Sequence, residues 1–133
     1  MNKYFKILLV FAWILVGLSC QKKDNTPGDR SKVTVTFTSP APRQTYHKGD
    51  TVQVNTNVGY VSEILGIWVQ IIDTATGEKL FEDNHDTHTD HFSFPTSWVD
   101  TLSDSATLQV KISVFVTNSA TPAVRTTYFI SKP

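Results

Sequence analysis

The stretch Leu108-Gln109-Val110-Lys111-Ile112-Ser113-Val114-Phe115-Val116 sets the fold class of this chain. Apolar residues recur in it at every second position, which is the period of a β-strand that buries one face. The loop Asn118-Ser119-Ala120-Thr121-Pro122 follows, and the alternation then resumes in a run from Val124 to Ile130 that includes Thr126 and Tyr128. Two alternating runs on either side of a short loop predict a C-terminal β-hairpin.

Shorter strand-like runs fill the chain before this hairpin. They are mostly rich in β-branched or aromatic residues and lie at 33–38, 52–58, 67–72, 79–82 and 92–94. Thr76-Gly77-Glu78 supplies a turn between two of them, so residues 66–83 are predicted to form a second hairpin. No helical periodicity is found in this region. The pattern predicts an all-β, antiparallel sandwich of about seven strands.

The first 20 residues combine positive charge, an apolar run and a final cysteine. Lys3 and Lys6 form a positive n-region, residues 7–18 form an apolar h-region, and small residues stand just before Cys20. These are the parts of a lipoprotein export signal, so we expect a signal peptide at 1–19 and acyl chains on Cys20, which would hold the protein on a bilayer. An uncleaved membrane helix and an ordinary secretory signal are the alternatives.

The composition of the remaining chain limits its function further. Residues 21–31 are polar and contain Pro27-Gly28, so we expect 20–31 to be a lipidated cysteine with a flexible tether and 32–133 to be the domain. The 12 basic residues include Lys3 and Lys6, which leaves 10 beside 12 acidic residues after cleavage. This balance offers no electrostatic footprint for nucleic acid. With no second cysteine, the domain has no disulfide to support its core.

Four motifs spread over the chain after residue 19 resemble the same group of proteins. They are Cys20-Gln21-Lys22-Lys23-Asp24-Asn25, Phe37-Thr38-Ser39-Pro40, Tyr46-His47-Lys48-Gly49-Asp50-Thr51-Val52 and Thr76-Gly77-Glu78. Together they resemble lipoproteins of unknown function from the Bacteroidota that carry an immunoglobulin-like domain. The resemblance implies an immunoglobulin-like β-sandwich in the cell envelope. It also implies a lipid anchor in the outer membrane, on the periplasmic face or at the cell surface.

The segment from Glu82 to His91 holds His85, His88 and His91 together with four carboxylates. Imidazole and carboxylate are ligands for zinc, copper or nickel, and a curled loop would bring two or three ring nitrogens to one ion. A solvated polar loop is the alternative, and a strand beginning at Thr87 would put His88 and His91 on opposite faces. Metal binding by this loop is therefore the second functional hypothesis.

Three large aromatic residues, Tyr60, Trp68 and Trp98, are candidates for a binding surface. Exposed rings of this kind stack on glycans or anchor protein partners, although at least two of the three are expected in the core. Trp68 faces away from the apolar side of its own strand and is expected to fill a neighbouring layer.

The chain lacks the common nucleophile, metalloprotease and phosphate-loop motifs, so no enzymatic activity is expected. The leading hypothesis is a membrane-anchored, non-catalytic binding or interaction module with an unknown protein or glycan partner.

Four tripeptides share the order Asp, Thr or Ser, then an apolar residue. They resemble the O-glycosylation acceptor sequence of the Bacteroidota, and this resemblance implies glycans on Thr51, Thr74, Thr101 and Ser105. The same tripeptides are also typical of turns, where their side chains bond the nearby backbone. Both interpretations stay open from the sequence.

Overall fold

The computed structural model of the protein describes residues 28–118 and 121–133. Its elements are η1 (Arg30–Lys32), β1 (Thr34–Ser39), β2 (Thr45–His47), β3 (Thr51–Asp73), β4 (Lys79–Val99), β5 (Ala106–Phe115) and β6 (Ala123–Lys132). The prediction of an all-β protein is confirmed. Within these two ranges, no helix has the length and apolar character needed to cross a bilayer.

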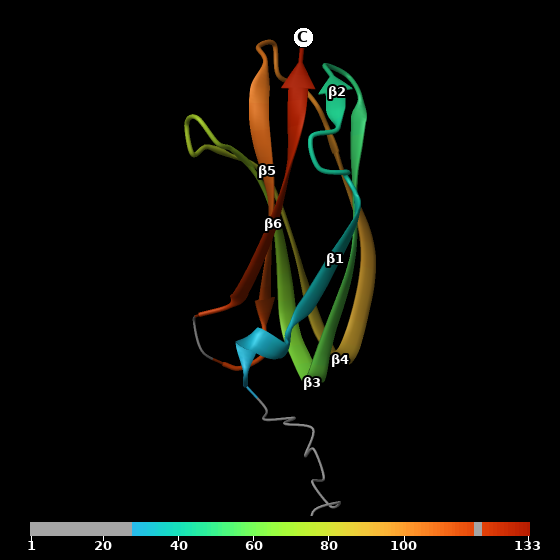
Figure 1. The fold of residues 1–133 in the computed structure, drawn as a ribbon, viewed down its shortest axis with the longest axis vertical. Coiled ribbons are helices and arrows are strands. Elements are labelled where there is room, and N and C mark those ends of the chain that lie inside the picture. The colour runs from blue at the N-terminus through green and yellow to red at the C-terminus, as the bar shows by residue number, and fades with distance from the viewer. Residues whose placement is uncertain (1–27, 119–120) are drawn as a thin grey trace, which may run out of the picture.

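All six strands belong to one mixed sheet. Its order is β1-β3-β5-β6-β2, and β4 pairs with β3 outside that path. β2 runs parallel to β6, whereas every other pair is antiparallel. The six strands of the described residues come close to the expected number, whereas the expectation that all of them pair antiparallel is wrong. The parallel pair arises because the link at 40–44 carries the chain from the edge of β3 to the edge of β6 without reversing its direction (Figure 1).

β3 and β4 form one long hairpin that folds back on itself. Residues 51–59 pair with 91–99, and residues 66–72 pair with 79–86. Between these two ladders the register shifts, and only Ile64 pairs across, with Thr89. Such irregular pairing lets a strand bend sharply, so each long strand has two halves that meet at the bend.

The bent hairpin explains why the strands are joined differently from the expected ones. Runs expected as four separate strands, at 52–58, 67–72, 79–82 and 92–94, are the halves of β3 and β4. The hairpin predicted at 66–83 is confirmed, with its turn after Asp73.

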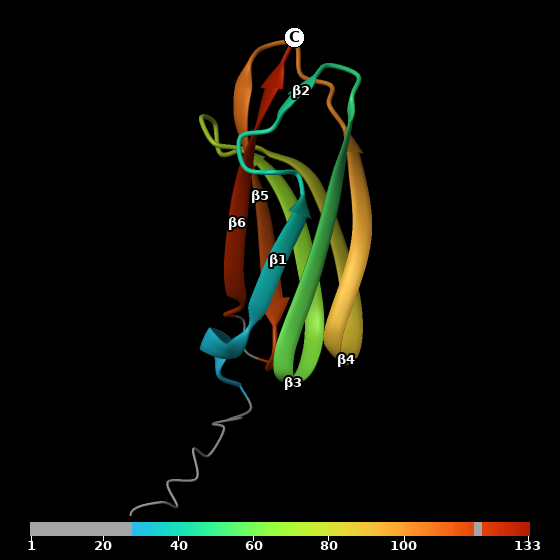
Figure 2. The same ribbon diagram turned by 45° about the vertical axis from the view of Figure 1, so that its right-hand side comes forward.

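The second edge of β3 is divided between two partners. β1 pairs along 55–59, and β5 pairs along 66–73. Because β3 bends between these stretches, the sheet curls strongly into a half-barrel (Figures 1 and 2). Its concave side holds the core, whose fully buried side chains are Val52, Val54, Ile64, Ile67, Val69, Ile71, Leu108, Val110, Ile112, Val114 and Phe129.

The C-terminal hairpin is confirmed, but β6 presents its alternating residues in a way that the sequence did not reveal. β5 buries Leu108, Val110, Ile112 and Val114, as its pattern suggests. In β6 the opposite set of residues to the predicted one is buried. This buried set contains Ala123, Thr127, Phe129 and Ser131. Val124, Thr126 and Tyr128 consequently point to solvent.

The described chain begins and ends at opposite ends of the sheet (Figure 1). The backbone N–H of Gly28 donates to the phenol oxygen of Tyr60 over 2.6 Å, and the Arg30 guanidinium donates to the Thr121 carbonyl over 3.1 Å. Asp29 caps η1, and hydrogen bonds from the Ser31 hydroxyl and N–H lower the pKa of Asp29. Residues 28–31, the last part of the predicted tether, therefore contact the domain.

Candidate functional site

The convex side of the sheet over β4, β3, β5 and β6 carries a group of outward side chains that we call the outer face. Register places them in rows: Trp68 lies opposite Ser113, and Ser113 lies opposite Val124. Trp68, Val124 and Tyr128 are 44%, 40% and 43% exposed, and they are three of the five large hydrophobic residues that the described chain exposes. The outer face consists of Trp68, Gln70, Glu82, Asn84, Asp86, Gln109, Lys111, Phe115, Val124, Thr126 and Tyr128.

A hollow of about 220 Å³ opens on the outer face beside Trp68. Trp68 and Phe115 form its aromatic wall, with ring centroids 5.1 Å apart and planes tilted by 56°. Asp86 of β4 and Asn118, which follows β5, add a carboxylate and an amide to the lining. We call this feature the Trp68 hollow.

Gly66 creates the Trp68 hollow because it has no side chain. It pairs with Phe115 on one side and with Asp86 on the other, in the row next to Trp68. A Cβ atom at Gly66 would lie 3.6 Å from the His85 carbonyl oxygen and 3.7 Å from an Asp86 carboxylate oxygen, which is ordinary contact. The space is therefore open to a ligand and is not required by backbone packing.

The chemistry of the Trp68 hollow suits a ligand with both apolar and polar surface. Two adjacent rings offer an apolar surface with π faces, on which sugar rings or aromatic side chains can stack. The Asp86 carboxylate makes no side-chain hydrogen bond or ion pair with any residue of 28–118 or 121–133. It is therefore available to accept hydrogen bonds from ligand hydroxyl or ammonium groups.

Charge on the outer face is balanced locally next to the hollow. Glu82 accepts hydrogen bonds from Lys79 over 2.8 Å and from the Gln70 amide. These two hydrogen bonds lower the pKa of Glu82, the Lys79 bond contributing most. This part of the outer face thus presents amides and a neutralised ion pair, and Lys111, opposite Gln70, adds one positive charge.

The structure places the predicted histidine segment on β4, so the expectation of a loop at 82–91 is wrong. β4 pairs only with β3, and charged or polar side chains on an exposed edge strand oppose pairing with other chains. This physical role explains the composition of the segment without a ligand.

His85, His88 and His91 each contact a different carboxylate. His85 Nε2 lies 3.2 Å from Asp83, and its ring packs on Phe94 with centroids 4.9 Å apart. His88 Nδ1 lies 2.7 Å from Glu63, and His91 Nδ1 lies 3.2 Å from Asp90. The hydrogen bond and charge of His91 lower the pKa of Asp90. In the part of the chain described, no three His, Cys, Asp or Glu residues are arranged to hold a metal ion.

Two of the three aromatic candidates lie in or against the core, as expected, but Trp68 is not one of them. Tyr60 is buried, with its hydroxyl bonded to Gly28. Trp98 packs against the core, 6.5 Å from Phe129 between ring centroids. Trp68, expected to fill a neighbouring layer, is instead exposed because the second half of β3 has no layer over its convex side. The role of Phe115 and Gly66 was missed, since their position beside Trp68 depends on register between distant strands.

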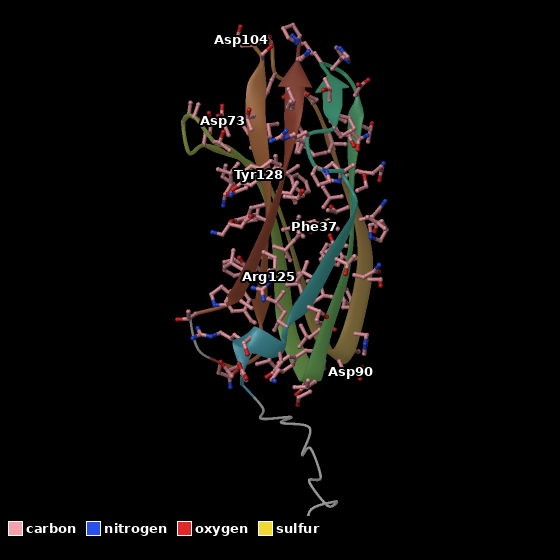
Figure 3. The ribbon with its side chains drawn as sticks, viewed as in Figure 1. Phe37, Asp73, Asp90, Asp104, Arg125 and Tyr128 are labelled. Carbon is pink, nitrogen blue, oxygen red and sulfur yellow. The ribbon has the colours of Figure 1, made fainter. Side chains whose placement is uncertain are left out.

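The four acceptor candidates Thr51, Thr74, Thr101 and Ser105 are all exposed. Asp73 and Asp104, which precede two of them, lie toward the end of the molecule opposite Asp90 (Figure 3). The Asp73 carboxylate accepts from the Ala75 N–H over 2.8 Å, and the Asp100 carboxylate accepts from the Leu102 N–H over 3.0 Å. Turn formation accounts for these aspartates, while the exposed hydroxyl groups keep glycosylation a prediction.

Cys20, the predicted lipidation site, lies outside the described residues. Comparison with known proteins adds no assignment: no protein-family model matches the chain, and no curated protein matches it significantly. The candidate site therefore rests on the geometry of the outer face.

Proposed function

We propose that the protein is a lipid-anchored envelope protein whose outer face, centred on the Trp68 hollow, binds a glycan or protein partner without catalysis. The observation that carries this proposal is the exposed Trp68 ring, set against Phe115 over a hollow that Gly66 keeps open. A large ring left exposed in solvent, inside a concave site and next to polar groups, is typical of an energetic anchor for binding.

We further propose that the curled sheet is an immunoglobulin-like sandwich. The bends of β3 and β4 divide the strands into two groups. One contains β1 with residues 51–59 and 91–99, and the other contains residues 66–73 and 79–86 with β5, β6 and β2. Immunoglobulin-like domains pack two such groups over a shared core, and many binding functions use this architecture.

The proposed anchor is compatible with an accessible outer face. The described chain starts with Gly28 at one end of the sheet, and at most about 29 Å of extended chain separates Gly28 from Cys20. A lipid on Cys20 would hold that end near the outer membrane. The strands of the outer face run along the long axis of the molecule, away from that end (Figure 2). The Trp68 hollow lies near the anchored end, because its lining residue Thr117 would be 3.1 Å from a Cβ atom at Gly28, so access to the hollow requires the tether to hold this end off the bilayer.

Binding by paired variants tests the proposal. The full-length lipidated protein in nanodiscs would be screened by interferometry against envelope polysaccharides and purified surface proteins, beside Trp68→Ala and Val99→Ala. Val99 is the matched control because it is 50% exposed but lies on the other half of β4. We expect a partner whose affinity falls about thirtyfold in Trp68→Ala, as for loss of a central anchor. Finding no partner, or equal effects of the two variants, would contradict the proposal.

A further inference from the structure

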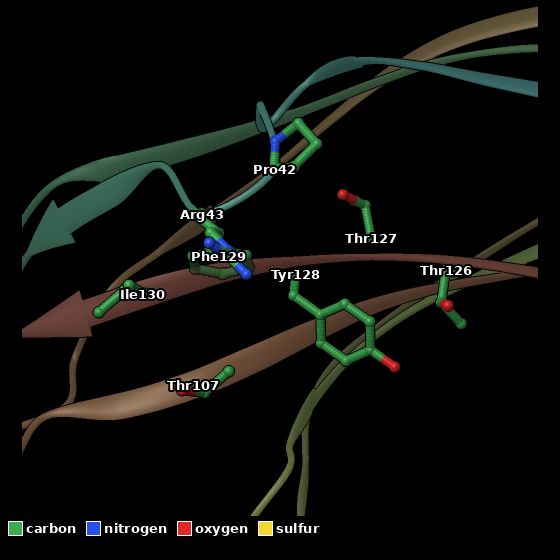
Figure 4. Close-up of a pocket in the computed structure, with 8 residues that line it drawn as sticks. All are labelled: Pro42, Arg43, Thr107, Thr126, Thr127, Tyr128, Phe129 and Ile130. Carbon is green, nitrogen blue, oxygen red and sulfur yellow. The ribbon is translucent and has the colours of Figure 1, made fainter.

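A second hollow, of about 550 Å³, lies where the 40–44 link crosses the edge of β6 (Figure 4). It is separate from the Trp68 hollow, with which it shares no lining residue. Its lining combines hydroxyl, aliphatic and aromatic groups with a single cation. It includes Arg43, Thr107, Thr126, Tyr128 and Ile130.

Arg43 is held in an unusual backbone conformation at this hollow. Its φ of 64° lies in the left-handed region. The other described residues with a positive φ are all glycines, namely Gly28, Gly49 and Gly77. An L-residue there is strained, and glycine would relieve the strain. The Arg43 N–H donates to the Tyr128 carbonyl over 2.9 Å, which fixes the link against β6. A side chain kept at a position suited to glycine indicates that the side chain itself is used.

The Arg43 guanidinium also differs from the other arginines in its hydrogen bonding. The other two arginines bond main-chain carbonyls: Arg30 bonds Thr121, and Arg125 bonds Val33 and Val124. Across residues 28–118 and 121–133, the Arg43 side chain has no hydrogen bond or ion pair. A planar guanidinium with free donors, beside an exposed ring, matches a carboxylate through two parallel hydrogen bonds.

We propose that this second hollow binds the carboxylate of an acidic sugar. Arg43 would hold the carboxylate, the Tyr128 ring would stack on the sugar ring, and the Thr107 and Thr126 hydroxyls would bond sugar hydroxyl groups. One guanidinium neutralises a single negative charge, which favours a carboxylate over a phosphate dianion.

A peptide carboxylate fits this hollow less well than a sugar. Extended peptides usually bind by adding a strand to a free sheet edge. The edge of β6 beside the hollow is already occupied, because the Tyr128 carbonyl accepts from Arg43 and the Ile130 N–H donates to the Gln44 carbonyl over 2.9 Å. The proposal goes beyond the proposed function, because it names another hollow and does not require Trp68, although Thr126 and Tyr128 also belong to the outer face.

Calorimetric titration of the full-length protein in nanodiscs tests this site. The probes are a galacturonic acid trisaccharide, a galactose trisaccharide without carboxylates, inorganic phosphate and a tripeptide with a free carboxylate. Each is titrated into the parent protein, Arg43→Gly, Trp68→Ala and Lys132→Ala. Lys132→Ala removes one exposed positive charge from the same strand, two residues beyond Ile130 and outside the lining of the hollow, and controls for net charge.

We expect the acidic trisaccharide alone to bind measurably, with at least tenfold weaker affinity for Arg43→Gly and unchanged affinity for Trp68→Ala and Lys132→Ala. Binding should also weaken as salt is added. The proposal is overturned if the acidic trisaccharide does not bind, if the galactose trisaccharide, phosphate or tripeptide binds as tightly, or if Arg43→Gly binds normally. Loss in Trp68→Ala alone would support the proposed function and reject this second site.

Discussion

Gly66 and Gly59 lie on the same strand, but added side chains would have opposite effects at the two positions. At Gly66 a Cβ atom meets only ordinary contacts, whereas at Gly59 it would lie 2.9 Å from the Thr34 hydroxyl oxygen, which bonds the Gly59 carbonyl. We expect Gly66→Ala to stabilise the protein by about 0.5–1 kcal/mol while weakening partner binding. Gly59→Ala should destabilise by about 1 kcal/mol through the displaced hydrogen bond. Urea unfolding of both variants measures the contrast, and equal shifts would refute it.

Arg43 offers a test in which stability and binding change in opposite directions. Its left-handed φ of 64° costs an L-residue about 1 kcal/mol relative to glycine. Arg43→Gly should therefore raise the free energy of unfolding by about that amount, measured by chemical denaturation. Unchanged or lower stability would show that the Arg43 side chain supports the fold, and it would remove the strain argument for a ligand.

At the scale of single strands, β6 places neighbouring residues in opposite environments. Phe129 is fully buried and contacts Tyr46 and Trp98, with ring centroids 5.5 and 6.5 Å away, whereas Tyr128 is 43% exposed. We expect Phe129→Ala to cost about 3–5 kcal/mol, by removing a large core side chain, and Tyr128→Ala to cost less than about 1 kcal/mol. Thermal and urea unfolding compare the two. A larger loss of stability for Tyr128→Ala would mean that β6 turns its opposite face to the core.

The β3–β4 hairpin should lose stability in acid partly through Glu82. Its pKa is lowered in the folded state by hydrogen bonds from Lys79 and Gln70, so the ionised carboxylate favours folding. This contribution is present above the unfolded pKa and disappears as pH falls through the folded pKa. Glu82→Gln should therefore show a shallower loss of stability between neutral and acidic pH. An identical pH profile for parent and variant would exclude the effect.

The sequence predicted individual hairpins well but not how they are joined. Alternation identified the segments of β3, β4, β5 and β6 because burial of one face imposes a period of two. It did not reveal that β3 continues through 60–65, since a bend at irregular pairing leaves no simple pattern. For β6, the more apolar alternating set faces solvent, because hydrophobicity alone does not decide which of two mixed faces is buried.

For the whole molecule, we expect the lipid to determine where the protein resides. Cys20→Ser should abolish incorporation of a labelled fatty acid and release the protein from the membrane fraction, because Cys20 is the only thiol of the chain. Metabolic labelling followed by membrane fractionation measures both effects. Normal labelling of Cys20→Ser would reject the anchor, and a membrane-bound but unlabelled parent would favour an uncleaved membrane segment.

The candidate site also belongs to the scale of the whole molecule. The sequence singled out Trp68 as an aromatic candidate but placed it in a neighbouring layer, and it predicted none of the Trp68 hollow. That hollow needs Gly66 and Trp68 from β3, Asp86 from β4 and Phe115 from β5, which come together only through the pairing of three strands. Sequence periodicity assigns residues to the faces of one strand, so it cannot predict a site built from residues of several strands.

The central claim is that the outer face around Trp68 is the binding surface. It is tested most directly by amide and indole NMR of the labelled full-length protein in nanodiscs during addition of an envelope polysaccharide fraction. We predict that chemical-shift changes concentrate on the Trp68 indole, Phe115 and neighbouring outer-face residues, with the Trp98 indole unaffected. Changes confined to β1 and residues 91–99, or none at saturating polysaccharide and surface-protein concentrations, would contradict the account.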